Sequence, residues 1–225
     1  SVLAMVLNLE KLSPAGNWLL DLVFPRQCSR CNEFGHYLCF RGVSSKPIVA
    51  YYPRAKRGWY LDGIIAAFDY KKDEPLRQGI QAMKYDGVPE IAKLLGEELF
   101  CQVRGLIDQK ALLVPVPLHQ KRLKYRGFNQ AVLIANAFGG KGFEVEELLI
   151  RKVSTQTQTE LDRKDRAANL AGAFALSKGK SKLAKSRTIF LVDDVATTGS
   201  TLNAAAKMLK KSGAKKVFGL VVAKD

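Results

Sequence analysis

The stretch that decides the fold reads TIFLVDDVATTGST and spans residues 188–201. It begins as an unbroken apolar run, which is typical of a strand buried on both faces of a parallel sheet. The run ends on Asp193 and Asp194, and a hydroxyl-rich turn with Gly199 follows directly. Ligands of doubly wound α/β sheets bind at the carboxyl ends of the strands. The stretch therefore predicts a parallel core and a polar site at the edge of that core.

The residues around this strand end suit a sugar phosphate. Ionised Asp193 and Asp194 can accept hydrogen bonds from the vicinal hydroxyls of a ribose, or help to hold a divalent cation. Residues 197–201 would wrap around the start of the next helix, where free N–H groups and the helix dipole attract an anion. The alternative is that the acids merely end a strand and that a hydroxyl residue merely caps a helix. Taken together, the residues predict a grip for a ribose 5-phosphate.

The rest of the chain alternates strand-like and helix-like segments, as expected of βαβ units in a doubly wound sheet. Cys101 lies among apolar residues of a helix-like segment, and we expect it to be a core thiol. The apolar start of the chain, residues 1–24, is expected to form an amphipathic helix. Strands are expected within residues 61–70, 111–118, 143–153, 188–195 and 215–225, and helices within residues 75–87, 89–106, 129–140 and 201–214.

The composition fits a folded protein with anionic partners. The chain has 225 residues, of which 47% are hydrophobic and 25% are charged, so it can bury a core. Its net charge of +15 favours phosphates or nucleic acid as partners, although basic residues also serve solubility. No apolar run reaches the roughly 20 residues that span a bilayer, and the chain starts without a signal-peptide pattern. We therefore expect no membrane insertion and a cytoplasmic location.

A basic segment, HQKRLKYRGFNQ, follows the strand expected within residues 111–118. Its cations would stabilise a departing diphosphate, and arginine offers a planar fork for phosphate oxygens. Solvated loop residues are the alternative for each lysine, and a helix N-cap is the alternative for Asn129. We do not assign His119 as a catalytic base, because the reacting carbon needs charge stabilisation more than proton removal. The cations of the segment are Lys121, Arg122, Lys124 and Arg126.

Three motifs, in order, resemble those of one family. They are VPVPLHQKRLKYRGFNQA (114–131), TQTQTELDRKDRAANLAGAF (155–174) and IFLVDDVATTGST (189–201). From about residue 26 onward, the chain resembles the ComF/GntX family of competence-associated proteins, which are similar to type I phosphoribosyltransferases. The resemblance implies an α/β protein with the type I phosphoribosyltransferase fold. That fold is a doubly wound, mainly parallel sheet of about five strands with a hood and, in this family, an N-terminal Cys-rich segment.

The resemblance also implies a ligand and the residues that bind it. The ligand is phosphoribosyl pyrophosphate (PRPP) with Mg²⁺, which would bridge the leaving group and the ribose hydroxyls. The expected catalytic residues are Asp193, Asp194 and Arg126. The expected PRPP-binding residues are Asp193, Asp194, Val195, Ala196, Thr197, Thr198, Gly199, Ser200 and Thr201. The expected pyrophosphate-binding residues are Pro117, Leu118, His119, Arg122, Arg126 and Asn129. Gln158, Arg166 and Asn169 are expected on a flap that closes over the substrate.

The cysteine-rich segment departs from the family pattern. It contains Cys28, Cys31 and Cys39, and this tight spacing favours a metal site over disulfides. The family usually completes a zinc site with a second Cys-x2-Cys pair, but the fourth position here is Gly42. His36 is the local candidate for the fourth ligand of a tetrahedral zinc. A water, a distant ligand, or no metal with free buried thiols are the alternatives.

We expect two units and weigh two functions. Residues 1–47 would form a helix and a zinc-finger-like segment, and residues 48–225 a phosphoribosyltransferase-like domain with a hood (48–110) and a core (111–225). The first function is transfer of phosphoribosyl to an unidentified acceptor with release of pyrophosphate. The alternative is a non-catalytic module that senses the metabolite or binds single-stranded DNA. The family's association with competence and DNA uptake implies single-stranded DNA and a competence helicase as partners.

Overall fold

A computed structural model describes residues 26–225 except 42, 44–45, 52–57 and 153–171. The helix expected over residues 1–24 and the position of Gly42 lie outside the described residues. The elements in chain order are β1 (Ile48–Tyr51), β2 (Gly63–Asp69), α3 (Glu74–Tyr85), α4 (Pro89–Val103), β3 (Leu112–Pro115), α5 (Gln120–Arg126), α6 (Gln130–Gly139), β4 (Glu144–Val145), β5 (Leu149–Arg151), β6 (Phe174–Leu176), the 3₁₀ helix η2 (Ser181–Ala184), β7 (Thr188–Ala196), α8 (Ser200–Lys211) and β8 (Lys216–Lys224).

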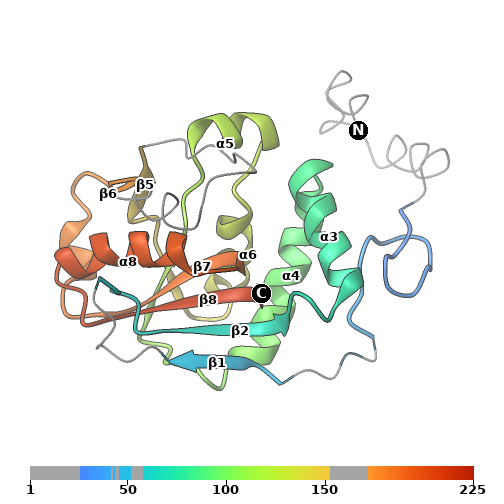
Figure 1. Cartoon of the computed structure of the whole chain (residues 1–225), viewed down its shortest axis with the longest axis horizontal. Helices are drawn as coiled ribbons and strands as arrows, with labels where there is room; N and C mark the ends of the chain where they lie inside the picture. Colours follow the sequence, from blue (N-terminus) through green and yellow to red (C-terminus); the bar gives the residue numbers. More distant parts are fainter. Residues whose placement is uncertain (1–25, 42, 44–45, 52–57, 153–171) are drawn as a thin grey trace.

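The main sheet has six strands in the order β1-β2-β8-β7-β3-β4. All of its pairings are parallel except that of the edge strand β1 with β2. β7 lies in the middle, between β8 and β3, and Figure 1 shows it beside β8. The expected doubly wound, mainly parallel sheet is confirmed, and the strand beyond the expected about five is the antiparallel β1.

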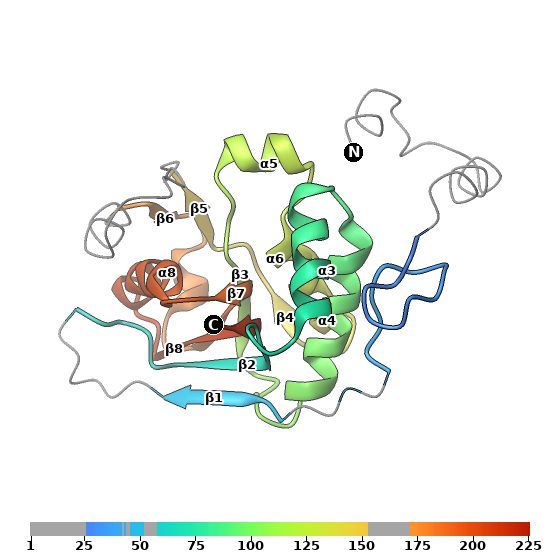
Figure 2. The ribbon, with the colours of Figure 1, turned by 45° about the vertical axis from the view of Figure 1, so that its right-hand side comes forward.

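β7 is buried on both faces because its apolar side chains alternate between two hydrophobic cores. Phe190 and Val192 belong to the core that α3, α4 and α6 cover. Ile189 and Leu191 belong to the core that α8 covers. Figure 2 shows α8 and the other three helices on opposite sides of the sheet. The continuous apolar run is thus explained by a central parallel strand, as its sequence predicts.

Side-chain caps set the starts of α3 and α6. Asp73 caps α3 by accepting a hydrogen bond from the N–H of Leu76. Asn129 caps α6 in the same way through the N–H of Ala131, so the N-cap alternative for this residue is confirmed. Such caps satisfy N–H groups that have no partner within the helix.

Cys101 is exposed, so its assignment to the core is wrong. The buried stripe of α4 contains Leu95, Leu99 and Val103, which are spaced four residues apart. Cys101 comes two residues after Leu99, and two residues turn an α-helix by about 200°. The thiol therefore lies on the far side of the helix from the core, although its sequence neighbours are apolar.

A small sheet accompanies the main one. It pairs β5 and β6 in antiparallel fashion. The stretch 48–110, expected as the hood, contributes β1 and β2 to the main sheet and α4 to its helical cover. The core of the molecule therefore begins well before residue 111.

Gly96 marks a close approach of α4 and α6. A Cβ at this position would lie 2.7 Å from the backbone oxygen of Ile134 and 2.9 Å from the Cβ of Ala137. We expect Gly96→Ala to lower the free energy of unfolding by about 2 kcal/mol, although alanine is the better helix former by about 1 kcal/mol. Gly105→Ala is the control, because its Cβ would meet no described atom within 4 Å. Urea denaturation measures both, and equal stabilities would contradict the close packing.

Candidate functional site

Two acidic side chains occupy the carboxyl end of β7. Alternation along the strand places Asp194 on the face of Phe190 and Val192, toward α3. Asp194 is buried, and its Oδ1 accepts a hydrogen bond of 2.9 Å from the N–H of Val195. Asp193 Oδ1 accepts a hydrogen bond of 2.9 Å from the N–H of Asp194. The backbone therefore fixes one oxygen of each carboxyl group.

Lys84 completes this group, and the sequence analysis did not identify it. Its Nζ in the last turn of α3 lies 2.7 Å from Oδ2 of Asp194. Burial works to lower the pKa of Lys84, but the charges of Asp194 and Asp193 outweigh it and raise that pKa. Burial works to raise the pKa of Asp194, but Lys84 outweighs it and lowers that pKa. Burial and the charge of Asp194 raise the pKa of Asp193 well above its usual range. The ion pair of Lys84 and Asp194 thus stands beside a carboxyl group that ionises less readily than a free aspartate.

The turn after β7 forms an open helix start. Gly199 is the N-cap of α8 with φ of 74°, in the left-handed region that favours glycine. Oγ of Ser200 lies 2.8 Å from Oγ1 of Thr198, which also accepts a hydrogen bond from the N–H of Ser200. Thr197 and Thr198 are exposed, and Ser200 and Thr201 are half-buried. Hydroxyls and backbone N–H groups thus gather at the positive end of α8.

Asn203 is a second residue that the sequence analysis missed. Its Oδ1 accepts hydrogen bonds from the N–H groups of Tyr60, at 2.6 Å, and Leu61, at 3.2 Å. Its Nδ2 donates to the carbonyl of Gly58 at 3.2 Å. This one side chain therefore holds the segment before β2 against the first turn of α8. The remaining predicted PRPP-binding residues, Val195 and Ala196, are the last residues of β7.

The segment between β3 and α6 follows the next strand of the sheet. Pro117 and Leu118 lead from β3 to α5 and are half-buried. His119 is the N-cap of α5, and its Nδ1 accepts a hydrogen bond from the backbone. Asn129 donates from Nδ2 to the carbonyl of Val116 at 3.2 Å. Asn129 thus ties the end of the segment back to its start.

Arg126, the last residue of α5, connects this segment to α3. Its Nε donates to the carbonyl of Lys84 at 3.2 Å. Its Nη1 donates to Oε1 of Gln130 at 2.6 Å, and Gln130 is itself buried. The guanidinium group is therefore held in place by two neutral acceptors, and its charge stays available to a ligand.

Three arginines gather on this side of the site. Burial lowers the pKa of Arg126, the charge of Asp194 opposes that shift, and the charge of Arg122 adds to it. Burial and the charge of Arg122 lower the pKa of Arg151 on β5, while Asp193 works to raise it. Arg122 is thus within electrostatic reach of both other arginines, and such a cluster suits a polyanion. Arg151 was not predicted. The predicted flap residues Gln158, Arg166 and Asn169 lie outside the described residues.

A second cluster brings together the side chains of Cys28, Cys31, His36 and Cys39. Their ligand atoms all lie within 4.8 Å of one another. Sγ of Cys31 lies 3.7 Å from Sγ of Cys39 and 3.7 Å from Nε2 of His36. Zinc–ligand bond lengths imply about 3.8 Å between two sulfurs and about 3.6 Å between sulfur and nitrogen on an ideal tetrahedron. The four residues therefore fit a tetrahedral zinc, with His36 as the fourth ligand beside the three cysteines.

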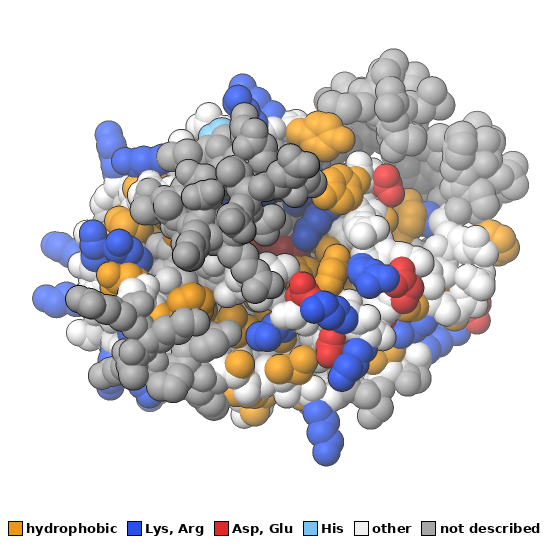
Figure 3. All heavy atoms as spheres, viewed as in Figure 1, with side chains coloured by type: hydrophobic (Ala, Val, Ile, Leu, Met, Phe, Trp, Pro, Cys, Tyr) orange, Lys and Arg blue, Asp and Glu red, His pale blue; other side chains and the backbone are white. Residues whose placement is uncertain are grey.

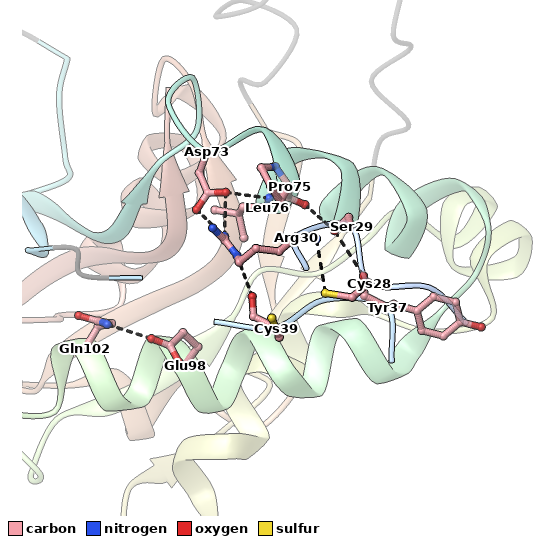
Figure 4. A network of polar contacts seen from close by, with 10 residues as sticks. All are labelled: Cys28, Ser29, Arg30, Tyr37, Cys39, Asp73, Pro75, Leu76, Glu98 and Gln102. Carbon is pink, nitrogen blue, oxygen red and sulfur yellow. Dashed lines mark hydrogen bonds and ion pairs between the residues drawn. The ribbon is translucent and has the colours of Figure 1, made fainter. Parts of the chain in front are cut away.

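The cysteine cluster is docked on the start of α3 (Figure 4). Arg30, between the first two cysteines, donates to both carboxylate oxygens of Asp73 at 2.7 and 2.8 Å. The same guanidinium donates from Nε to the carbonyl of Cys39 at 2.8 Å. Ser29 Oγ donates to the carbonyl of Pro75 at 3.1 Å. The cluster and the first turn of α3 thus share one polar network.

Two features, the charge of the surface and the length of the apolar helices, bear on the possible partners. Lys and Arg side chains are spread over the face shown in Figure 3. Within the part of the chain that the structure describes, no helix combines the length and the apolar character that a membrane crossing needs.

Comparisons with known proteins indicate the family of the chain. A family profile described as "Phosphoribosyl transferase domain" matches residues 123–225. Competence protein F of Haemophilus influenzae is 36% identical over 64% of this chain and 66% of its own length. The DNA utilization protein YhgH of Escherichia coli is 32% identical over 67% of either chain. Competence protein ComFC of Streptococcus pneumoniae is 30% identical over 72% of this chain and 71% of its own.

Solved structures show a weaker likeness. A hypoxanthine phosphoribosyltransferase of Staphylococcus aureus has 13% identity and a TM-score of 0.35 over 61% of this chain and 65% of that chain. These values are too low to bear on function. The sequence relatives are sufficient to assign the family, because two of them match over two thirds or more of their length at 30% identity or above. The chain therefore belongs to the ComF family of competence-associated, phosphoribosyltransferase-like proteins.

Proposed function

We propose that this protein binds PRPP and transfers its phosphoribosyl group to an acceptor, releasing pyrophosphate. The observation that carries the proposal is the meeting of three features at one edge of the sheet. These features are the carboxyl groups of Asp193 and Asp194, the open start of α8, and the arginines around Arg126. A ribose 5-phosphate with a pyrophosphate at its anomeric carbon needs acceptors for its hydroxyls and donors for both anionic ends. The site offers each of these.

The charges also suit the reaction. When the anomeric carbon loses pyrophosphate, negative charge grows on the leaving group. Arg122, Arg126 and Arg151 are already gathered on one side, so little reorganisation is needed as that charge develops. The acidic pair on the ribose hydroxyls would fix the orientation of the sugar ring.

Mg²⁺ is the cation expected with PRPP. The residues do not fit its direct coordination by Asp194, because the N–H of Val195 holds Oδ1 and Lys84 holds Oδ2. Mg²⁺ prefers several water and phosphate oxygens over an all-protein cage. In this proposal it reaches the site on the pyrophosphate oxygens of the substrate.

The acidic pair gives a sharp test. Asp193→Asn should weaken PRPP binding by about tenfold or more, because an NH₂ donor replaces one of the oxygens that accept hydrogen bonds from the ribose hydroxyls. The same change should leave the protein as stable at neutral pH or more so, since a raised folded-state pKa means that ionisation above it costs folding free energy. Asp194→Asn should weaken binding and also destabilise, since it leaves Lys84 unpaired.

Calorimetric titration and thermal unfolding measure the two effects. Asp108→Asn is the control, since Asp108 lies in the turn before β3, at the opposite edge of the sheet. Binding by the Asp193→Asn/Asp194→Asn double variant that equals wild type would rule out this site.

A second candidate function is binding of single-stranded DNA, and α5 favours it. Tyr125 is 67% exposed and stands among the exposed cations Lys121 and Lys124. Bases stack on exposed aromatic rings while lysines hold the phosphates. Tyr85, which follows Lys84, is 71% exposed as well. The names of the relatives refer to competence and DNA utilization, which agrees with a DNA ligand.

Substitutions at Tyr125 test that candidate. Tyr125→Ala should weaken binding of a mixed-sequence single strand by about tenfold, the effect of one lost stacking contact, whereas Tyr125→Phe keeps the ring and should bind as wild type. Fluorescence anisotropy at two salt concentrations measures the affinity and its salt dependence. Equal affinities of the alanine and phenylalanine variants would show that the ring does not stack on a base.

We further propose that Cys28, Cys31, Cys39 and His36 hold a structural zinc ion. Burial opposes ionisation of Cys28, but N–H groups of Cys31 and Arg30 outweigh it and lower its pKa to about 6. A thiolate is the form that binds zinc. A reducing compartment such as the cytoplasm would keep these thiols available to the metal.

The zinc content of variants tests whether His36 is the fourth ligand. The wild type should carry about one zinc per chain, His36→Ala should lose most of it, and His36→Cys should retain it, since sulfur restores a closed tetrahedral set. Cys101→Ala is the control because this exposed thiol lies outside the cluster. Native mass spectrometry reads the stoichiometry. Full zinc content in His36→Ala would exclude His36 as a ligand.

A further inference from the structure

Lys84 and Asp194 form an ion pair within the ribose grip, by which we mean the carboxyl groups of Asp193 and Asp194 that are proposed to bind the ribose. Nζ of Lys84 is 2.7 Å from Oδ2 of Asp194, whose side chain is only 5% exposed. The other oxygen of Asp194 accepts the N–H of Val195. Both oxygens therefore have a fixed partner, and the carboxylate has one orientation.

The backbone of Lys84 is held as firmly as its ammonium group. Its carbonyl accepts the Nε–H of Arg126, whose Nη1 is anchored on the buried Gln130. The residue also belongs to the last turn of α3, whose buried face includes Ile80 and Met83. The ammonium group is thus presented to the carboxylate by a helix, with little freedom left to lose when a ligand binds.

Three ionisable groups of the acidic type act on the ammonium of Lys84, and Asp194 is the nearest of them. Asp194 is in contact, and Asp193 and Tyr70 act on it from a greater distance. The charge of Arg126 is also within electrostatic reach of Asp194 and Asp193. A buried carboxylate pair needs a nearby cation to remain ionised. In many sites a divalent metal supplies that charge, but here the chain supplies it.

We propose that Lys84 is the built-in counter-cation of the ribose grip, so that the ribose 5-phosphate part of the substrate binds without a divalent cation. The proposal rests on the proposed function, because it needs a ribose at Asp193 and Asp194. It makes Lys84 a positioning residue, which acts through Asp194 and not on the reacting atoms. It also confines any need for Mg²⁺ to the pyrophosphate end of the substrate.

The alternative is a structural ion pair that merely joins α3 to β7. Both roles predict that loss of Lys84 lowers stability, so stability does not distinguish them. They differ in the response to metal. If the lysine acts as counter-cation, its removal leaves a place beside two carboxyl groups that Mg²⁺ can fill. If it only joins two elements, Mg²⁺ restores nothing.

Ribose 5-phosphate is the probe, because it lacks the pyrophosphate that carries Mg²⁺. Its binding to the full chain is titrated by calorimetry in excess EDTA and in Mg²⁺. The wild type should bind equally, within about twofold, under both conditions. Lys84→Met should bind about tenfold more weakly in EDTA and recover most of the loss in Mg²⁺. Lys84→Arg should stay near wild type in EDTA, and Lys93→Met, an exposed lysine of α4, should bind as wild type.

The outcomes separate this inference from the proposed function. Wild type that binds the probe only with Mg²⁺ would overturn the role of Lys84 and leave the PRPP site intact. Lys84→Met with wild-type affinity in EDTA, or with a loss that Mg²⁺ does not reverse, would do the same. Wild type that binds neither the probe nor PRPP would overturn both. If Lys84→Met fails to fold, the metal dependence of the wild type and of Lys84→Arg still decides the question.

Discussion

The site depends on the parallel pairing of β7 with its neighbours. Parallel strands bring their carboxyl ends to one edge of the sheet, whatever the distance between them in sequence. From that edge β2 leads to α3, β3 leads to α5, and β7 leads to α8. The two helices α3 and α5 start at this edge, and their last turns bring Lys84 and Arg126 near Asp194. The pairing in turn requires β7 to be apolar on both faces up to Val192, so the charged residues can begin only where the strand leaves the two cores.

α3 links the two clusters of chemical interest. Its first turn is capped by Asp73, which also binds Arg30 of the cysteine cluster, and its last turn carries Lys84. Twelve residues of α-helix span about 18 Å, so a rigid element connects the two places. Any ion that organises the cysteine cluster would hold Arg30 against Asp73 and so stabilise the start of this helix. The position of Lys84 is then set partly by packing of α3 on the sheet and partly by its anchorage at the far end.

The sequence predicts most of the strands and helices well, because each rests on a local signal, and it places two acids at the carboxyl end of β7. The apolar run 188–192 followed by two acids has few other structural solutions. Cys101 shows where local reasoning fails, since its neighbours are apolar but its own place on the helix faces away from the core. Lys84 is the opposite case, a charged residue at a position where a buried apolar one is expected. It comes four residues after Ile80 and so continues the buried stripe of α3. A cation at such a position signals a buried anionic partner, but only the fold shows that the partner is Asp194.

Positive charge is in excess at this edge of the sheet. Two acids, Asp193 and Asp194, stand near four cations, which are Lys84, Arg122, Arg126 and Arg151. Like charges held in one place lower the stability of the folded state, a cost that proteins accept at functional sites. A bound polyanion would remove that repulsion in addition to forming its own hydrogen bonds. The repulsion between these cations is thus already present in the folded chain, and a polyanionic ligand would find them in position.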